Sequence, residues 1–129
     1  AEGIRSMEGA EAELRDACDA DLEDLLACDG IVIGSPEYFG YMSGAVKDFF
    51  DRTYEQARGK VFRKPYALFV NAGNDGTGAC THIERICIGF QLKRVYEPIV
   101  AKGEITDEVL EACRLMGQTI AAGCEAGIY

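Results

Sequence analysis

The sequence has 129 residues, of which 48% are hydrophobic and 27% charged, a composition typical of a folded globular domain and not of a disordered chain. The formal net charge is −9, and no cluster of Lys or Arg offsets it, which argues against nucleic-acid binding. No apolar run approaches the roughly 18 residues that cross a bilayer, and the N-terminus lacks a signal-peptide core. We therefore expect a single domain over residues 1–129, cytoplasmic and not bound to a membrane.

The six cysteines and the single histidine do not have the spacing of a metal site. There is no C-x-x-C pair, and His82 follows Cys80 by two residues on a predicted helix, which is a poor arrangement for tetrahedral zinc. We predict no metal site. The cysteines are interpreted as reduced thiols, most of them behaving as small hydrophobic residues of the core.

The first thirty residues predict three short elements. Ala1 to Met7 read as the end of a helix that stops near Gly9. Ala10 to Cys18 alternate as a short strand with Leu14 pointing inward. The acidic residues between Asp19 and Asp24 surround leucines and predict a short, acidic-capped helix.

A buried strand at Gly30–Gly34 is the clearest element of the chain. Its β-branched apolar run stops at Gly-Ser-Pro, and an aromatic loop, Pro36–Ser43, follows over the carboxyl end of the strand. Val46, Phe49 and Phe50 then recur at helical spacing and predict a helix from about Gly44 to Ala57. Open α/β sheets bind ligands at such strand ends.

A second strand at Tyr66–Val70 has the same design. It is apolar at nearly every position, so we expect both of its faces to be buried. It ends in a segment rich in Gly and Asn, Asn71–Gly78, whose backbone N–H groups would be free to face a ligand.

The remaining pattern alternates helix and strand. Ala79–Phe90 is predicted as a helix, Lys93–Val100 as a strand at a sheet edge because it contains Pro98, and Thr106 to about Glu125 as a helix capped by Thr106. This alternation predicts a parallel sheet covered by helices on both faces. The pattern alone leaves Rossmann-type and flavodoxin-like windings open.

The segment Gly34-Ser35-Pro36-Glu37-Tyr38-Phe39-Gly40-Tyr41-Met42-Ser43-Gly44 resembles the flavin-binding pattern of the flavodoxin-like superfamily, in its NAD(P)H-dependent FMN and quinone reductase branch. The resemblance implies an α/β fold, a flavodoxin-like doubly wound parallel sheet of order 2-1-3-4-5 in a three-layer α/β/α sandwich, with FMN as cofactor. The family's first strand and phosphate loop have no counterpart before Ala1, so we expect an N-terminally incomplete domain whose phosphate-binding residues lie upstream. In that order Ala10–Cys18 and Gly30–Gly34 would flank the first strand, roughly 9.6 Å apart. Direct pairing of these two segments would instead mean that the phosphate subsite is missing.

The resemblance also assigns residues to the site. The backbone around Tyr38, Phe39 and Gly40 is expected nearest N5 of the flavin, and the second loop near its pyrimidine edge, where backbone dipoles would stabilise negative charge. Asp75 is interpreted as a cap of the following helix. No catalytic residue is assigned, because hydride transfer to a flavin needs no dedicated acid or base. The predicted cofactor-binding residues are Ser35, Pro36, Glu37, Tyr38, Phe39, Gly40, Met42, Ser43, Asn71, Ala72, Gly73, Asn74, Gly76 and Thr77.

Three functions fit these residues. The favoured one is an FMN-binding oxidoreductase that transfers electrons from NAD(P)H to a quinone, a flavin or another small acceptor, and relatives of that branch lead us to expect a homo-oligomer. The alternatives are a flavodoxin-type electron carrier, consistent with the acidic charge, and a flavin-free interaction domain of the same fold. In the first reading, replacing Gly76 by Val should weaken flavin binding more than folding.

Overall fold

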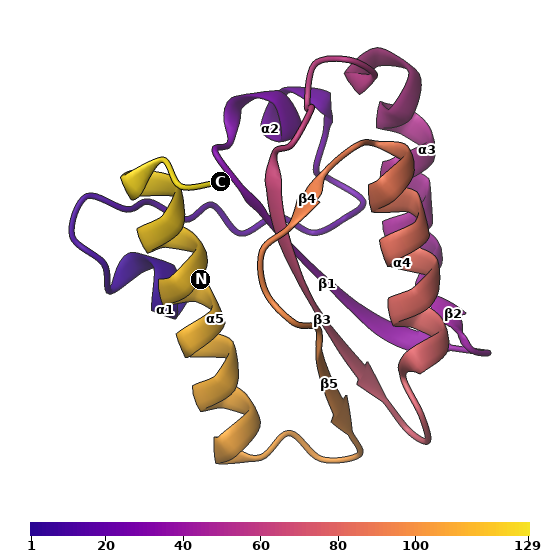
Figure 1. Ribbon diagram of the computed structural model, residues 1–129. Helices are drawn as coiled ribbons and strands as arrows, with labels where there is room; N and C mark the ends of the chain where they lie inside the picture. Colours follow the sequence, from indigo (N-terminus) through magenta and orange to yellow (C-terminus); the bar gives the residue numbers. More distant parts are fainter.

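The computed structural model describes residues 1–129 as a sheet with helices on both faces (Figure 1). Helices α3 and α4 cover one face, and α5 covers the other, with the short helix α1 packed against α5. This is the predicted three-layer α/β/α arrangement. The elements in chain order are α1 (Glu2–Arg5), α2 (Leu22–Ala27), β1 (Ile31–Tyr38), β2 (Tyr41–Met42), α3 (Gly44–Ala57), β3 (Pro65–Ala72), α4 (Thr77–Gly89), β4 (Lys93–Arg94), β5 (Ile99–Lys102) and α5 (Asp107–Ala126).

Strand β3 is the centre of the sheet. It pairs in parallel with β1 on one side, and with both β4 and β5 on the other. The predicted parallel sheet is therefore confirmed, but the predicted strand Lys93–Val100 is divided into β4 and β5. Pro98 lies in the gap between them, and because proline has no N–H it cannot continue the ladder.

The predicted strand Ala10–Cys18 is wrong. These residues form no ladder, and Leu14 is 78% exposed instead of pointing inward. Side chains hold the segment: the Arg5 guanidinium donates to the Ala12 carbonyl at 2.7 Å, and that of Arg52 to the Ala17 carbonyl at 2.9 Å. Ala, Glu and Asp, which fill this stretch, are poor strand formers without a partner strand. The segment does not pair with β1, whose ladder partners are β2 and β3. The predicted spacing of roughly 9.6 Å was a distance between two strands, and it cannot be tested because Ala10–Cys18 is not a strand.

The predicted helices are largely confirmed. Helix α3 has the predicted bounds, with the Ser43 hydroxyl accepting from the Val46 N–H, and Thr106 caps α5 by accepting from the Val109 N–H. Helix α4 begins two residues before the predicted Ala79, at Thr77. No helix is long and apolar enough to cross a membrane.

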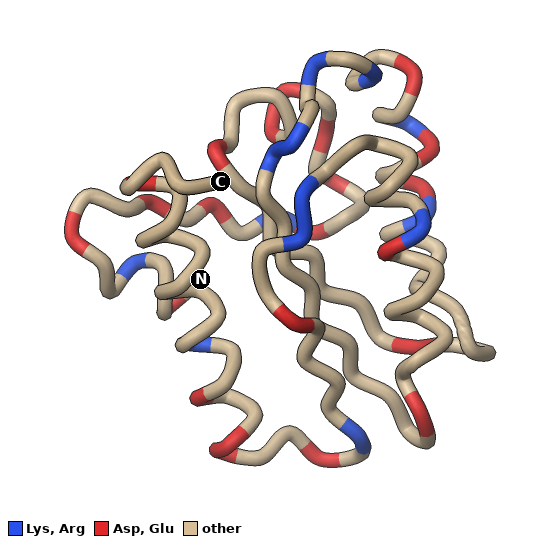
Figure 2. Tube along the Cα trace, viewed as in Figure 1, with Lys and Arg blue, Asp and Glu red and all other residues tan.

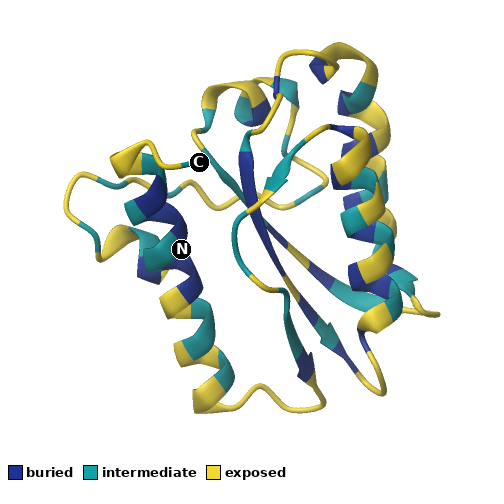
Figure 3. Ribbon diagram, in the orientation of Figure 1, coloured by how far each residue is buried: buried dark blue, intermediate teal, exposed yellow.

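The larger core lies between the sheet and helices α3 and α4 (Figure 3). It includes Phe49 and Phe50 of α3, Leu68 of β3, and Ile83 and Cys87 of α4. A smaller core forms on the opposite face, where α5 packs on the sheet. All six cysteines are free thiols, and of these Cys80 and Cys87 are buried.

The charged residues are distributed unevenly between the two ends of the sheet (Figure 2). Four basic residues, Arg58, Lys60, Arg63 and Lys64, precede β3 and so lie at its amino end. The carboxyl ends of β1 and β3, where the sequence predicts the site, lie at the far end of the same strands.

Candidate functional site at the carboxyl ends of β1 and β3

The carboxyl ends of β1 and β3 lie side by side, as predicted. The two strands are in register from Ile31 opposite Tyr66 to Pro36 opposite Asn71. Both chain segments that follow them therefore leave the sheet at the same edge (Figure 1).

The first segment is a β-hairpin and not the predicted loop. Strand β1 continues through Pro36 to Tyr38, and β2 returns antiparallel to it, with Tyr38 opposite Tyr41. The turn consists of Phe39 and Gly40, whose φ angles are 53° and 70°. A hairpin turn of this kind needs both residues in the left-handed region, which is unfavourable for Phe. The strained residue is also fully exposed, a combination that occurs at functional sites.

The hairpin directs successive side chains to opposite faces of the sheet. Ser35 is buried and points into the larger core side, where its hydroxyl accepts from the Ser43 N–H at 2.9 Å and donates to the Pro36 carbonyl at 2.7 Å. Ser35 therefore fixes the returning arm of the hairpin. Tyr38, on the other face, is 60% exposed.

Glu37 links the hairpin to α4. Its carboxylate oxygens accept from the backbone N–H groups of Gly76 at 2.9 Å and Ala79 at 3.0 Å. The N-cap residue that precedes α4, Gly76, has no side chain to cap the helix, and its φ is 88°. The sequence interpretation of Asp75 as the cap is therefore wrong: Asp75 accepts a hydrogen bond from the Thr77 hydroxyl instead. No local pattern predicts the capping by Glu37, because Glu37 is separated along the chain by 39 positions from Gly76 and by 42 from Ala79.

Several predicted site residues have side chains committed to the fold. Met42 and Ala72 are each 3% exposed, Gly76 is buried, and Ser43 caps α3. The Asn71 amide donates to the carbonyls of Ala101 and Gly103, at 3.3 and 3.2 Å, and so ties β3 to the end of β5.

Six exposed residues at this edge are open to a ligand, and together we call them the open edge. They are the last residue of β1, the two residues of the hairpin turn and three residues of the loop between β3 and α4, and all are exposed: Tyr38, Phe39, Gly40, Gly73, Asn74 and Asp75. The predicted Thr77 is also exposed, but it is the first residue of α4 and its hydroxyl donates to Asp75. Tyr41, by contrast, is half-buried and packs against His82 with ring centroids 4.7 Å apart.

Phe69 was not predicted to be accessible. The apolar run Tyr66–Val70 predicts burial on both faces, yet Phe69 is 40% exposed. Its ring lies against Gly34 of β1, where an added Cβ would come within 2.3 Å of the Phe69 Cζ. The two-residue alternation of strands places Phe69 on the face opposite Leu68 and Val70, which belong to the larger core.

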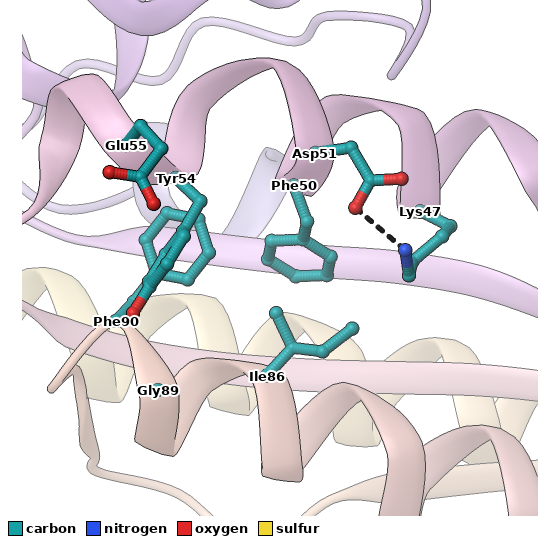
Figure 4. Close-up of a pocket in the computed structure, with 8 residues that line it drawn as sticks. All are labelled: Lys47, Phe50, Asp51, Tyr54, Glu55, Ile86, Gly89 and Phe90. Carbon is teal, nitrogen blue, oxygen red and sulfur yellow. Dashed lines mark hydrogen bonds and ion pairs between the residues drawn. The ribbon is translucent and has the colours of Figure 1, made fainter.

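Two surface hollows lie away from the open edge. One, of about 360 Å³, is formed between α3 and α4 over Phe50, Ile86 and Phe90, and Lys47 and Asp51 pair at 2.6 Å on its rim (Figure 4). The other, of about 560 Å³, is lined by residues 94–97. The first has an apolar floor and few converging polar groups, so its chemistry does not suggest a cofactor site.

The open edge suits a flat, polar-edged aromatic ligand. Exposed aromatic side chains offer stacking surfaces, and the exposed backbone at Gly73–Asp75 offers amides, with no atom within 4 Å of a Cβ built on Gly73. A flavin carries out the redox chemistry itself, so a protein that uses one has to supply surfaces that bind and orient the ring. Aromatic side chains and free backbone amides are such surfaces.

Comparison with known proteins decides the family. The family model described as NADPH-dependent FMN reductase matches residues 6–106, a range that contains the whole open edge. The chain belongs to this family. FMN is therefore its cofactor, and the protein is a flavoprotein with a redox role.

Similar proteins of known structure have the same fold as this member of the FMN reductase family. The chain is 32% identical over 137 residues to a flavodoxin of Aquifex aeolicus, covering 94% of this chain and 74% of that protein. It resembles the structure of a flavodoxin from the domain Archaea, with a TM-score of 0.80 and 23% identity over 95% of this chain and 83% of the other. It also resembles the flavodiiron protein from Giardia intestinalis, with a TM-score of 0.83 and 21% identity over 97% of this chain and 31% of the other. The flavodoxin-like fold is thus confirmed.

Proposed function

We propose that the protein is an NAD(P)H-dependent oxidoreductase whose FMN passes electrons to a quinone, a free flavin or another small acceptor. The observation that carries the proposal is the open edge, which lies inside the segment matched by the FMN reductase family model. Tyr38 is 60% exposed and Phe39 fully exposed, so an aromatic ring that stacked on them would lie at the surface of the molecule. A nicotinamide must stack on the flavin for hydride transfer, which requires such access.

In this proposal each part of the open edge has one task. The backbone of Tyr38, Phe39 and Gly40 would hold the reactive edge of the ring, and the amides of Gly73–Asp75 the pyrimidine edge. FMN held there would supply the hydride-accepting and electron-donating chemistry of the reaction. No side chain of the open edge needs to gain or lose a proton for this chemistry.

Steady-state oxidation of NADH and of NADPH by the FMN-loaded, full-length protein tests the proposal. We expect turnover with a benzoquinone or with free FMN as acceptor, at a rate that saturates with the reduced nicotinamide. An FMN-loaded protein that neither nicotinamide reduces would overturn the enzymatic reading.

The second candidate is a one-electron carrier, favoured by the 32% identity to a flavodoxin and by the net charge of −9. A carrier would accumulate a stable semiquinone during stepwise photoreduction and would show no turnover with NAD(P)H. We expect little semiquinone, because the reductase function transfers electrons in pairs from the nicotinamide.

A further inference from the structure

We propose that Glu37 is a positioning residue of the flavin site, which fixes both halves of the open edge and lowers the reduction potential of the bound FMN. The inference rests on the proposed FMN site at the open edge. It changes the expected role of Glu37 from a residue that contacts the cofactor to one that acts through the backbone of α4.

The carboxylate of Glu37 is held by the start of α4. Glu37 lies opposite Met42 in the hairpin, and its two oxygens accept from Gly76 and Ala79, at 2.9 and 3.0 Å. Both oxygens are therefore engaged by the first turn of α4. Hydrogen bonds to an ionised acceptor are roughly twice as strong as neutral ones, and a negative charge is favoured at a helix N-terminus.

The loop Gly73–Asp75 is held at both ends. At its start, the Gly103 N–H donates to the Ala72 carbonyl at 2.8 Å. At its end, the Gly76 N–H is held by Glu37. A loop of three exposed residues between two such anchors has little freedom, so its amides are presented in one arrangement.

The hairpin turn is fixed by the same contact. The backbone of Gly78, in the first turn of α4, lies so close to the hairpin that an added Cβ would come within 2.2 Å of the Gly40 carbonyl oxygen. Glu37 accepts hydrogen bonds from Gly76 and Ala79, which precede and follow Gly78, and so holds this part of α4 against the hairpin. Loss of its carboxylate would therefore loosen Tyr38–Gly40 and Gly73–Asp75 at once.

The charge of Glu37 has an effect of its own. Glu37 places a full negative charge beside the loop that is proposed to face the pyrimidine edge, and it offsets the positive end of the α4 dipole. Reduction adds electrons to the flavin, so this charge disfavours the reduced form relative to the oxidised form. Geometry and charge can therefore be separated by substitution.

Three variants of the full-length protein make this separation. Glu37→Asp keeps the charge but is one methylene too short to reach both amides. Glu37→Gln keeps the length but loses the charge and one of the two hydrogen bonds, and Glu37→Ala loses everything. Glu84→Gln is the matched control, because it also removes a carboxylate charge near α4, but Glu84 lies on α4 itself and pairs with Arg94 outside the open edge.

We expect all three Glu37 variants to bind FMN about ten-fold more weakly, as the loss of a helix cap predicts. The Gln and Ala variants should also favour reduced over oxidised FMN by about ten-fold more than the wild type, a rise of about 30 mV for a two-electron couple. The Asp variant and Glu84→Gln should leave the potential unchanged. Hydrogen exchange of the Gly76 and Ala79 amides should accelerate in the Glu37 variants and not in the control.

The outcomes separate this inference from the proposed function. Wild-type protein that binds FMN, with Glu37 variants of unchanged affinity and potential, would overturn the role of Glu37 and leave the proposed function standing. Wild-type protein that holds FMN but is not reduced by NAD(P)H would overturn the proposed function, while the affinities and potentials of the variants would still decide the role of Glu37. A potential that rises equally in the Asp and Gln variants would also overturn the charge argument.

Discussion

At the scale of single residues, the two-residue period of β1 decides what the predicted flavin-binding motif does. Ser35 and Glu37 fall on the side of α3 and α4, where they hold the hairpin and the start of α4. Tyr38 falls on the other face and stays exposed. Neighbouring residues of one motif thus have different roles: Ser35 and Glu37 hold the backbone in place, and Tyr38 is free to face a ligand.

Gly76 shows that a glycine in a binding loop can be required by the fold. Its φ is 88°, and an added Cβ would lie 2.4 Å from Cγ1 of Val100. The structure therefore changes the expectation that Gly76→Val mainly weakens flavin binding, since the substitution would be strained and crowded in the folded protein. We predict that Gly76→Ala alone lowers the free energy of unfolding by about 2 to 4 kcal/mol.

Urea unfolding of the apoprotein measures this effect, with Gly73→Ala as the control. Gly73 has nothing within 4 Å of an added Cβ and no positive φ, so its substitution should change the free energy of unfolding by less than about 0.5 kcal/mol. Equal destabilisation by both substitutions would contradict the account of Gly76.

At the scale of elements, the sequence predicts those helices whose caps and apolar face lie within one continuous segment. Helix α3 has its cap Ser43 and its apolar face within one continuous segment, and its bounds were predicted correctly. The N-terminal cap of α4 could not be predicted, because Glu37 reaches it from a different element. Likewise, alternation of apolar residues at Ala10–Cys18 predicted a strand, but a strand forms only where another strand pairs with it.

Another long-range contact stabilises α2. The Lys64 ammonium group donates to the carbonyls of Leu25, Leu26 and Cys28, at the C-terminal end of that helix. This end of a helix carries partial negative charge and unpaired carbonyls, which a cation satisfies. The basic segment before β3 therefore contains one structural lysine.

We predict that Lys64→Met lowers the free energy of unfolding by about 1.5 to 3 kcal/mol, the usual range for hydrogen bonds to a charged group. Lys60→Met is the matched control, because Lys60 is exposed in the same segment and should change stability by less than about 0.5 kcal/mol. Thermal and urea unfolding of the two variants measure both. If the Lys64→Met and Lys60→Met variants had the same free energy of unfolding, Lys64 would not stabilise α2.

At the scale of the whole molecule, the buried thiols make stability depend on alkaline pH. Burial raises the pKa of Cys80 to about 11 and that of Cys87 to about 12. The unfolded chain would lose these protons near pH 9, whereas the folded protein keeps them. The folded state therefore binds more protons above pH 9, and its stability falls as the pH rises.

Each buried thiol should cost about 1.4 kcal/mol of unfolding free energy per pH unit between pH 9 and its folded pKa. Urea unfolding under reducing conditions, from pH 8 to 11, measures the slope. The Cys87→Ala variant should be less stable than the wild type at pH 8, but its free energy of unfolding should fall less steeply with pH. The Cys18→Ala variant, which removes an exposed thiol, should show the same slope as the wild type. A wild-type stability that is flat over this range would contradict the prediction.

The central claim is that FMN binds at the open edge, between the hairpin turn and the loop Gly73–Asp75. Titration of the isotope-labelled, full-length protein with FMN, followed by amide chemical shifts, tests it directly. The account predicts the largest changes at Tyr38, Phe39, Gly40, Gly73, Asn74 and Asp75, and small ones in the hollow between α3 and α4. Changes concentrated around Phe50, Ile86 and Phe90, with the open edge unaffected, would contradict it.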